Sequence, residues 1–181
     1  MAAATPAAAV SILRERVAML TGAAPEGIER LAGGDLSEVL LVSRPGLPPV
    51  VAKSGGNVAA EALMLRTLAE AGVPVPSVEG EFGEILLISH VAHDEAFTPR
   101  AWSDIGRQVR AMHSRVGDHY GWPSDYAFGS VRLDNRQRRD WPGFWAEQRL
   151  DAAAATLDLP WRERVERLAG RLSGLLPPAP A

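Results

Sequence analysis

The segment Val50–Pro76, VVAKSGGNVAAEALMLRTLAEAGVPVP, is the stretch that most constrains the fold of this chain. It begins with a short apolar run that ends on Lys53, and a Ser-Gly-Gly-Asn break follows. The next residues have a helical pattern with Glu61 in the first turn, and Gly72 with the following Val-Pro-Val-Pro run ends it. A lysine at a strand end and a glutamate at the start of the next helix can form an ion pair. We therefore predict that Glu61 holds the Lys53 ammonium in place.

Composition narrows the class of protein. The 181 residues are enough for one domain or two small lobes with a sizeable core. A net charge of −3 and a pI of about 5.8 give no electrostatic support for binding nucleic acid or an anionic membrane. The absence of cysteine fits the cytoplasmic location that we expect. No apolar run approaches the roughly 18–20 residues of a membrane helix, and Met1–Val10 lacks the basic and apolar regions of a signal peptide.

The first half of the chain alternates between apolar runs and turn signals. Two apolar runs within residues 28–43 flank Gly33–Ser37, which indicates a hairpin whose tip can bring backbone N–H groups close to an anion. The proline-rich Arg44–Pro49 predicts a turn. With an amphipathic helix before them and one helix after the third strand, five strands make an antiparallel α+β lobe. The other predicted elements are a helix at Ser11–Leu20 and strands at Val50–Ser54, Val78–Glu81 and Ile85–Ser89.

The second half has helical periodicity. Pro99 marks the start of a helix that ends near His113, and residues 114–139 are aromatic-rich with no clear period. Asp140 is a candidate N-cap for a further helix, and a last helix begins near Pro160. We expect a flexible N-terminus at residues 1–10, a β-rich lobe at 11–91 and a helical lobe at 92–181. The apolar faces of the first and last of these helices are Trp102, Ile105, Val109 and Met112, and Val165, Leu168, Leu172 and Leu175.

The first half resembles the small-molecule kinases of the aminoglycoside phosphotransferase type. The resemblance covers residues 33–91 and is carried by the glycine tip, Lys53, Glu61 and Val-Pro-Val-Pro in that order. It implies a protein-kinase-like, two-lobed α+β fold. The N-lobe would be a five-stranded antiparallel sheet with one helix, and the C-lobe would be helical and incomplete.

The second half is similar to the fructosamine kinase (ketosamine-3-kinase) family within that superfamily. The similar elements, in the order that the family has them, are Tyr120-Gly121-Trp122, Asp125–Gly129, Asn135, Asp140–Trp145 and Arg149-Leu150. The chain departs from the family pattern at Tyr126-Ala127 and at Arg132–Asp134. The resemblance implies ATP-dependent phosphorylation of a sugar hydroxyl on a ketosamine, such as a glycated lysine.

The resemblance also implies a phosphate-binding role for residues in the N-lobe. Lys53 would bind the α- and β-phosphates of ATP and Glu61 would hold it, while Gly33, Gly34 and Ser37 would cover the phosphates. Each residue type also has an ordinary structural explanation. These are a solvated strand-end lysine, a glutamate favoured by the helix dipole, and a plain hairpin turn.

The adenine-binding residues are implied in the same way. Val39 and Val51 would form the apolar roof over adenine, and the backbone of Ser89, His90 and Val91 would pair with the adenine edge as the hinge between lobes. Ordinary core packing explains the two valines equally well, and a plain linker explains the hinge.

Candidates for the acceptor site are few. Trp122 and Trp141 lie in the irregular aromatic region and could line a sugar or amine site, although core packing is the default for tryptophan. His113 at a helix end is best explained as a structural residue, and His93 and His119 show no metal-ligand spacing.

The catalytic loop of the family is missing from the sequence. That loop is similar to HGDLWSGN and precedes a DPA-type metal-binding aspartate, and neither occurs here. We therefore expect the front portion of a kinase, with no catalytic base, no ligands for the Mg²⁺ of the intact family member and no turnover alone. Self-association through an exposed apolar C-lobe surface is a further expectation. The alternatives are an aminoglycoside- or choline-type phosphotransferase, a non-catalytic nucleotide-binding or interaction module, and a plain α+β domain.

Overall fold

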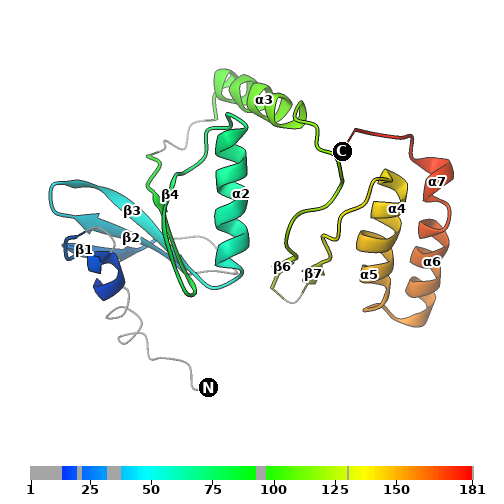
Figure 1. Ribbon diagram of the computed structural model, residues 1–181, viewed down its shortest axis with the longest axis horizontal. Coiled ribbons are helices and arrows are strands. Elements are labelled where there is room, and N and C mark those ends of the chain that lie inside the picture. The colour runs from blue at the N-terminus through cyan, green and yellow to red at the C-terminus, as the bar shows by residue number, and fades with distance from the viewer. Residues whose placement is uncertain (1–13, 20–21, 32–37, 93–96, 130, 181) are drawn as a thin grey trace. The chain divides into compact units, whose positions relative to one another are not determined.

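A computed structural model describes residues 14–19, 22–31, 38–92, 97–129 and 131–180 (Figure 1). The chain divides into two compact units, Met1–Gln108 and Val109–Ala181. The first unit is β-rich and the second is mostly helical, so the predicted α+β class is confirmed. The division falls within helix α3 (Pro99–His113).

The first unit is built on one antiparallel sheet, as predicted. Its spatial order is β1-β2-β3-β5-β4, and every neighbouring pair is antiparallel. Helix α2 (Val58–Glu70) connects β3 to β4. The strands are β1 (Gly27–Arg30), β2 (Glu38–Arg44), β3 (Leu47–Ser54), β4 (Val78–Phe82) and β5 (Ile85–Ser89).

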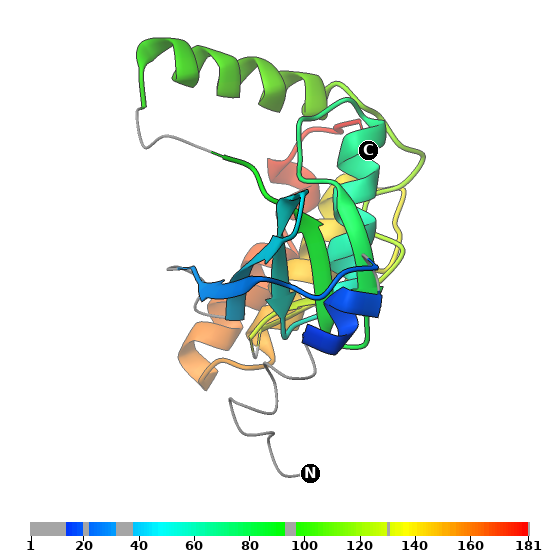
Figure 2. The same cartoon turned by 90° about the vertical axis from the view of Figure 1, so that its left-hand side faces the viewer.

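Alternating side chains give the sheet two apolar faces. One face carries Val42, Val50, Ala52 and Leu87, which pack around the fully buried Val17 of a helical segment at residues 14–19. The opposite face packs against α2, and its buried members are Val51, Val58, Ala62, Leu86 and Ile88. Figure 2 shows segment 14–19 in front of the sheet and α2 behind it.

One boundary in the sheet differs from the prediction. The turn predicted over Arg44–Pro49 is only Pro45-Gly46, because β2 extends to Arg44 and β3 begins at Leu47. Gly46 has φ +64°, a conformation that glycine adopts without strain and that permits this tight reversal. Pro48 is tolerated in the strand because it lies at its exposed start, next to a register irregularity.

The second unit contains elements that periodicity did not reveal. Residues 114–139, predicted as irregular, include a hairpin of β6 (Tyr126–Phe128) and β7 (Val131–Leu133), whose three-residue strands are too short to show alternation. The predicted single last helix is two, α6 (Leu159–Ala169) and α7 (Leu172–Leu175), interrupted at Gly170, a poor helix former.

The helix capped by Asp140 changes its winding. It begins as α4 (Trp141–Trp145), continues as the π-helix η1 (Ala146–Asp151) and ends as α5 (Ala152–Ala154). The Asp140 carboxylate accepts a hydrogen bond of 2.7 Å from the Gly143 amide, which confirms the predicted N-cap.

Helix α3 buries none of its residues, and Trp102, Ile105 and Val109 on its apolar face are exposed. Leu168 of α6 is exposed as well, whereas Leu172 is buried. Self-association through these side chains stays a prediction. Among the described residues, no helix is both long and apolar enough to cross a membrane.

Candidate functional site

The ion pair predicted from the sequence is present. Lys53 lies near the end of β3, Glu61 lies in the first turn of α2, and the Lys53 Nζ contacts the Glu61 Oε1. About three-quarters of each side chain is buried, with relative exposures of 25% and 24%. Lys53 is also the only lysine in the sequence. The pair therefore fixes the single ammonium side chain of the protein at the end of a central strand.

Local sequence explains why Glu61 reaches this position. The Asn57 side chain caps α2 by accepting a hydrogen bond of 3.0 Å from the Ala60 amide, and the Glu61 amide donates to the Asn57 carbonyl at 3.0 Å. Gly55 and Gly56 before it have positive φ values of 96° and 72°, which favour glycine. This break turns the chain from β3 into α2 so that the first helical turn faces the strand end.

The sheet register places apolar side chains beside the ammonium. Val39, Lys53 and Leu86 are direct partners across β2, β3 and β5. Leu41, Val51 and Ile88 form the next row on the same face. The predicted roof residues Val39 and Val51 thus share the α2 face of the sheet with Lys53, where Val51 is buried and Val39 is partly buried.

The other residues predicted to bind the nucleotide lie in the segment after β5 and in the glycine tip. The Ser89 amide donates to the Ser77 carbonyl at 2.9 Å, and its hydroxyl accepts from the Ser77 amide at 2.9 Å, so Ser89 is tied to the segment before β4. His90 and Val91 follow β5, and Val91 is exposed. Gly33, Gly34 and Ser37 lie outside the described residues.

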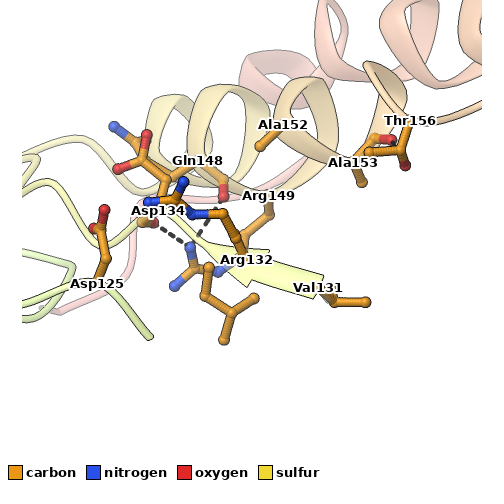
Figure 3. Close-up of a pocket in the computed structure, with 10 residues that line it drawn as sticks. Asp125, Val131, Arg132, Asp134, Gln148, Arg149, Ala152, Ala153 and Thr156 are labelled. Carbon is orange, nitrogen blue, oxygen red and sulfur yellow. Dashed lines mark hydrogen bonds between the residues drawn. The ribbon is translucent and has the colours of Figure 1, made fainter. Parts of the chain in front are cut away.

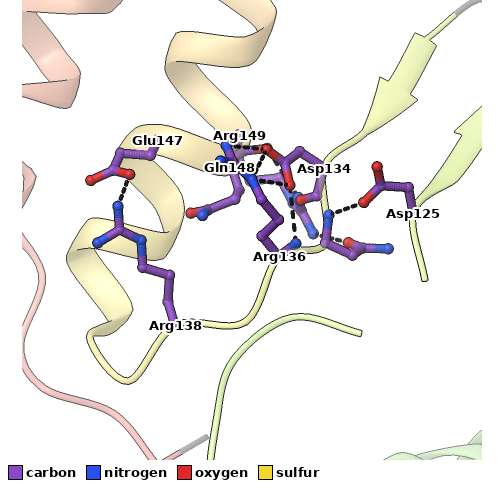
Figure 4. A network of polar contacts seen from close by, with 8 residues as sticks. Asp125, Asp134, Arg136, Arg138, Glu147, Gln148 and Arg149 are labelled. Atoms are coloured by element: carbon purple, nitrogen blue, oxygen red, sulfur yellow. Dashed lines mark hydrogen bonds and ion pairs between the residues drawn. The ribbon is translucent and has the colours of Figure 1, made fainter. Parts of the chain in front are cut away.

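A second candidate site lies in the helical unit and is organised around Arg149 of the π-helix. The Arg149 guanidinium donates to the Asp134 carbonyl, to the Gln148 carbonyl at 3.0 Å and to the Asn135 Oδ1 at 2.8 Å. It also lies 4.5 Å from the centre of the Phe144 ring. Figure 4 shows how Arg149 joins η1 to the segment after β7.

Asn135 is the buried centre of this network. Its amide donates to the Asp125 Oδ1 at 2.9 Å, and its Nδ2 donates to the Ser124 carbonyl at 3.0 Å. Gly121 passes so close that a Cβ there would lie 2.5 Å from the Asn135 carbonyl oxygen. The network therefore fixes the otherwise irregular backbone between α3 and α4.

Charges in this network shift the pKa values of their neighbours. Hydrogen bonds from Arg136, whose guanidinium contacts the Asp134 carboxylate at 2.6 Å, lower the pKa of Asp134. Burial lowers the pKa of Arg149, and the nearby Asp134 charge opposes that effect. Among the described residues, no carboxylate lies within ion-pair distance of Arg149. The guanidinium is half-buried with neutral oxygens as its direct partners.

A pocket of about 580 Å³ opens between this network and the β6–β7 hairpin (Figure 3). Its polar lining combines two carboxylates, two guanidinium groups and two neutral polar side chains, and its apolar lining comes from the hairpin and from α5. The lining residues are Asp125, Arg132, Asp134, Gln148, Arg149, Thr156, Val131, Leu133, Ala152 and Ala153.

Three buried side-chain atoms among the described residues have no hydrogen-bond partner, and all three belong to the helical unit. Gln148 is only 3% exposed, yet its Oε1 has no hydrogen-bond partner. Trp122 Nε1 and Ser124 Oγ are buried without a partner as well, and both residues bond to Asn135 through their backbones. Such atoms carry a desolvation cost in the folded chain.

The predicted acceptor-site tryptophans lie in different surroundings. Trp141 belongs to an aromatic cluster with Tyr120, Phe144 and Trp145, with ring centres 5.0–6.2 Å apart. Trp122 lies beside the Asn135 network, and its amide donates to the Asn135 carbonyl at 3.0 Å. An acceptor role for either tryptophan stays a prediction.

Sequence reasoning singled out neither Gln148 nor Arg149 as a functional residue. In the sequence, Arg149-Leu150 is an element of the family pattern only, and no periodicity signals a π-helix. No local pattern distinguishes Gln148 from its polar neighbours Glu147 and Arg149. For the described ranges, no group of three or more histidine, aspartate or glutamate side chains could hold a metal ion.

Comparisons with known proteins agree on one family. The model of the family described as fructosamine kinase matches residues 21–164. The probable ketoamine kinase of Thermus thermophilus is 29% identical over 146 residues, which is 80% of this chain and 52% of that protein. The chain thus spans about half the length of this curated relative.

Solved structures agree with this match. A candidate fructosamine-3-kinase of Thermobifida fusca is 28% identical, with a TM-score of 0.79 over 93% of this chain and 64% of its own. A candidate fructosamine-3-kinase of Haemophilus somnus is 21% identical, with a TM-score of 0.73 over 89% of this chain and 60% of its own. The second likeness establishes the shared fold alone.

Proposed function

This chain belongs to the fructosamine kinase family, and we propose that it serves the ATP-dependent transfer of a phosphoryl group to a sugar hydroxyl of a ketosamine. In this proposal the β-rich lobe at residues 11–91 binds the nucleotide, and the acceptor is a small glycated amine such as glycated lysine. The observation that carries the proposal is the Lys53–Glu61 ion pair beside an apolar sheet face.

The arrangement of these groups fits a nucleotide. The Lys53 ammonium is a point charge for the α- and β-phosphates, and Glu61 keeps it from sampling other positions. Val39 and Val51 share its sheet face and would pack against the adenine ring. Past the end of β5, the backbone of His90 and Val91 would pair with the adenine edge, as would the Ser89 carbonyl. Gly33, Gly34 and Ser37 complete the proposed nucleotide site as the cover over the phosphates.

Bound ATP supplies the phosphoryl group, and Mg²⁺ normally neutralises charge on it. No described group of side chains in this chain is suited to hold the metal. The roles that we assign to this chain are therefore to bind the nucleotide, to fix one cation beside its phosphates and to exclude water from the adenine face.

We also propose that these 181 residues alone do not turn over substrate. The sequence contains no His-Gly-Asp element that could supply the aspartate which orients the acceptor hydroxyl. Positioning and charge stabilisation carry nearly the whole barrier in phosphoryl transfer, so nucleotide binding without them gives no transfer. ADP formation that depends on a ketosamine and disappears in Lys53→Ala would overturn this.

Nucleotide binding is the direct test. We expect a fluorescent ATP analogue to bind the chain, and Lys53→Ala to weaken binding by about tenfold or more, because a charge-assisted contact to phosphate is lost. Arg66→Ala is the matched control, since Arg66 of α2 forms an ion pair of 2.6 Å with Glu81 of β4 in the same unit. Equal losses in the two variants, or no binding by folded wild-type chain, would remove the nucleotide role.

A further inference from the structure

The connection from β3 to α2, residues 54–57, is held to the rest of the sheet unit at two points. Near its start, the Gly55 amide donates a hydrogen bond of 3.2 Å to the carbonyl of Glu84, which lies in the turn between β4 and β5. At its end, the Asn57 side chain accepts a hydrogen bond of 3.0 Å from the Ala60 amide. The path of the chain between the strand that carries the ammonium and the helix that carries its partner is therefore fixed by specific bonds.

The two members of the ion pair are supported unequally. Lys53 lies in β3, which has a neighbouring strand on each side, and its register partners there are Val39 and Leu86. Glu61 lies in the first turn of α2, and the first backbone amides of a helix have no acceptor within the helix. Glu61 is therefore the member of the pair whose position depends on a cap.

Asn57 supports this turn through two of its own oxygen atoms. Its Oδ1 accepts from the Ala60 amide at 3.0 Å, and its carbonyl accepts from the Glu61 amide at 3.0 Å. Because both bonds come from one residue, loss of the side-chain bond also loosens the backbone bond to Glu61. Helix α2 stays docked without the cap, since Val58 and Ala62 are buried against the sheet. A variant at this position therefore changes the first turn without unfolding the unit.

We propose that Asn57 is a positioning residue for the Lys53 ammonium, and that it acts by holding Glu61 against that ammonium through the first turn of α2. This inference rests on the proposed nucleotide role, because the cation that is positioned is the one assigned to the phosphates. Asn57 touches no part of the nucleotide in this account. Its loss therefore weakens phosphate binding only through the ion pair.

The single lysine of the sequence permits a test without nucleotide. A chain labelled with [13Cε]lysine gives one side-chain 13C signal, and the relaxation of that signal reports how freely the end of the Lys53 side chain moves. We expect Asn57→Ala to lower its order parameter by about a third or more. Asn57→Ser should restore the wild-type value, because serine caps helices about as well as asparagine does. An unchanged order parameter in folded Asn57→Ala would overturn the proposal.

Thr98→Ala is the matched control, since it removes a cap of the same kind from another helix. The Thr98 Oγ1 accepts a hydrogen bond of 3.2 Å from the Ala101 amide in the first turn of α3. Loss of this cap should leave the Lys53 signal as it is in wild type. An equal fall of the order parameter in Thr98→Ala and Asn57→Ala would mean that any lost cap loosens the chain, and it would refute a positioning role for Asn57.

A double-mutant cycle on binding of a fluorescent ATP analogue then separates positioning from general packing. Asn57→Ala should weaken binding by about three- to tenfold in the wild-type background. It should have almost no further effect when Glu61→Ala is already present, because Asn57 acts through Glu61. Equal losses in the two backgrounds would overturn the proposal. A chain that binds no ATP analogue, although its lysine signal responds as expected, refutes the nucleotide role and supports the positioning of Lys53 by Asn57.

Discussion

The two units of this protein are stabilised by different physics. The sheet unit buries apolar side chains on both faces of one sheet, and all of its described buried residues are apolar. The helical unit contains both described buried polar residues, Asn135 and Gln148, and all three buried side-chain atoms without a partner. Burial of apolar surface is non-directional, whereas hydrogen bonds fix groups at particular distances and angles. The stability of the first unit therefore depends on the alternation of apolar side chains along its strands, and the stability of the second depends on individual hydrogen-bonding residues.

The largest effect should come from the sheet core. Leu86 is fully buried between β3, β4 and α2, so Leu86→Ala removes packing from three elements and should cost about 3 kcal/mol of unfolding free energy. Leu47→Ala, at a position 46% exposed at the start of β3, should cost well under about 1 kcal/mol. Urea unfolding followed by circular dichroism measures both, and similar losses would deny the sheet an apolar core.

A backbone contact in the helical unit should rank next. Gly121 has φ +107°, and a Cβ there would lie 2.5 Å from the Asn135 carbonyl oxygen. Gly121→Ala should therefore cost about 2–3 kcal/mol from strain and displacement of the network. Gly83→Ala is the control, since its φ is +54° but no atom lies within 4 Å, and about 1 kcal/mol is expected. If the two glycines prove equally tolerant, the Asn135 network does not hold the loop.

The unpartnered glutamine should respond with the opposite sign. Gln148→Met removes a buried acceptor that has no donor, so ligand-free chain should gain up to about 1 kcal/mol of stability. Asn135→Leu is the counterpart, because it removes the side-chain donor to the Ser124 carbonyl and one of the three acceptors of Arg149, and it should be destabilising. Thermal unfolding of the two variants compares them. A marked destabilisation by Gln148→Met would mean that its amide is already satisfied.

The smallest effect should be on the pH dependence of stability. The pKa of Asp134 is lowered in the folded state from its ordinary value of 3.8, mainly by hydrogen bonding to Arg136. The folded chain therefore binds this proton less readily than the unfolded chain. The contribution is complete above pH 3.8 and is lost as the pH falls through the folded-state value. Urea midpoints between neutral and acidic pH should fall less steeply in Asp134→Asn than in wild type, and parallel curves would contradict the assignment.

The difference between the apolar sheet unit and the hydrogen-bonded helical unit also explains what could be predicted from the sequence. The five strands follow from alternation and turn residues, and the Lys53–Glu61 pair follows from a strand end beside a helix start. The turn predicted over Arg44–Pro49 is broader than the observed Pro45-Gly46, because prolines at the exposed start of a strand look like turn residues.

The helical unit escaped prediction for physical reasons. The β6–β7 strands are three residues long, and η1 is a short segment whose hydrogen bonds span one residue more than those of an α-helix, so neither leaves a period in the sequence. The contact of Arg149 with Asn135 joins residues 14 apart through a backbone that only the side chains themselves hold in place. The hydrophobic pattern of a sequence predicts which residues are buried, but it does not predict which polar atoms form hydrogen bonds with one another.

The solitary lysine has a consequence for chemistry at amines. A sugar aldehyde or a labelling reagent that attacks ε-amines finds one side-chain target in this protein, Lys53. That amine lies against Glu61 with about a quarter of its side chain exposed. Modification must therefore wait until the ion pair separates and the side chain swings out. The rate at which the ε-amine reacts therefore reports how often that ion pair opens. Any molecule that occupies the strand end will lower this reaction rate.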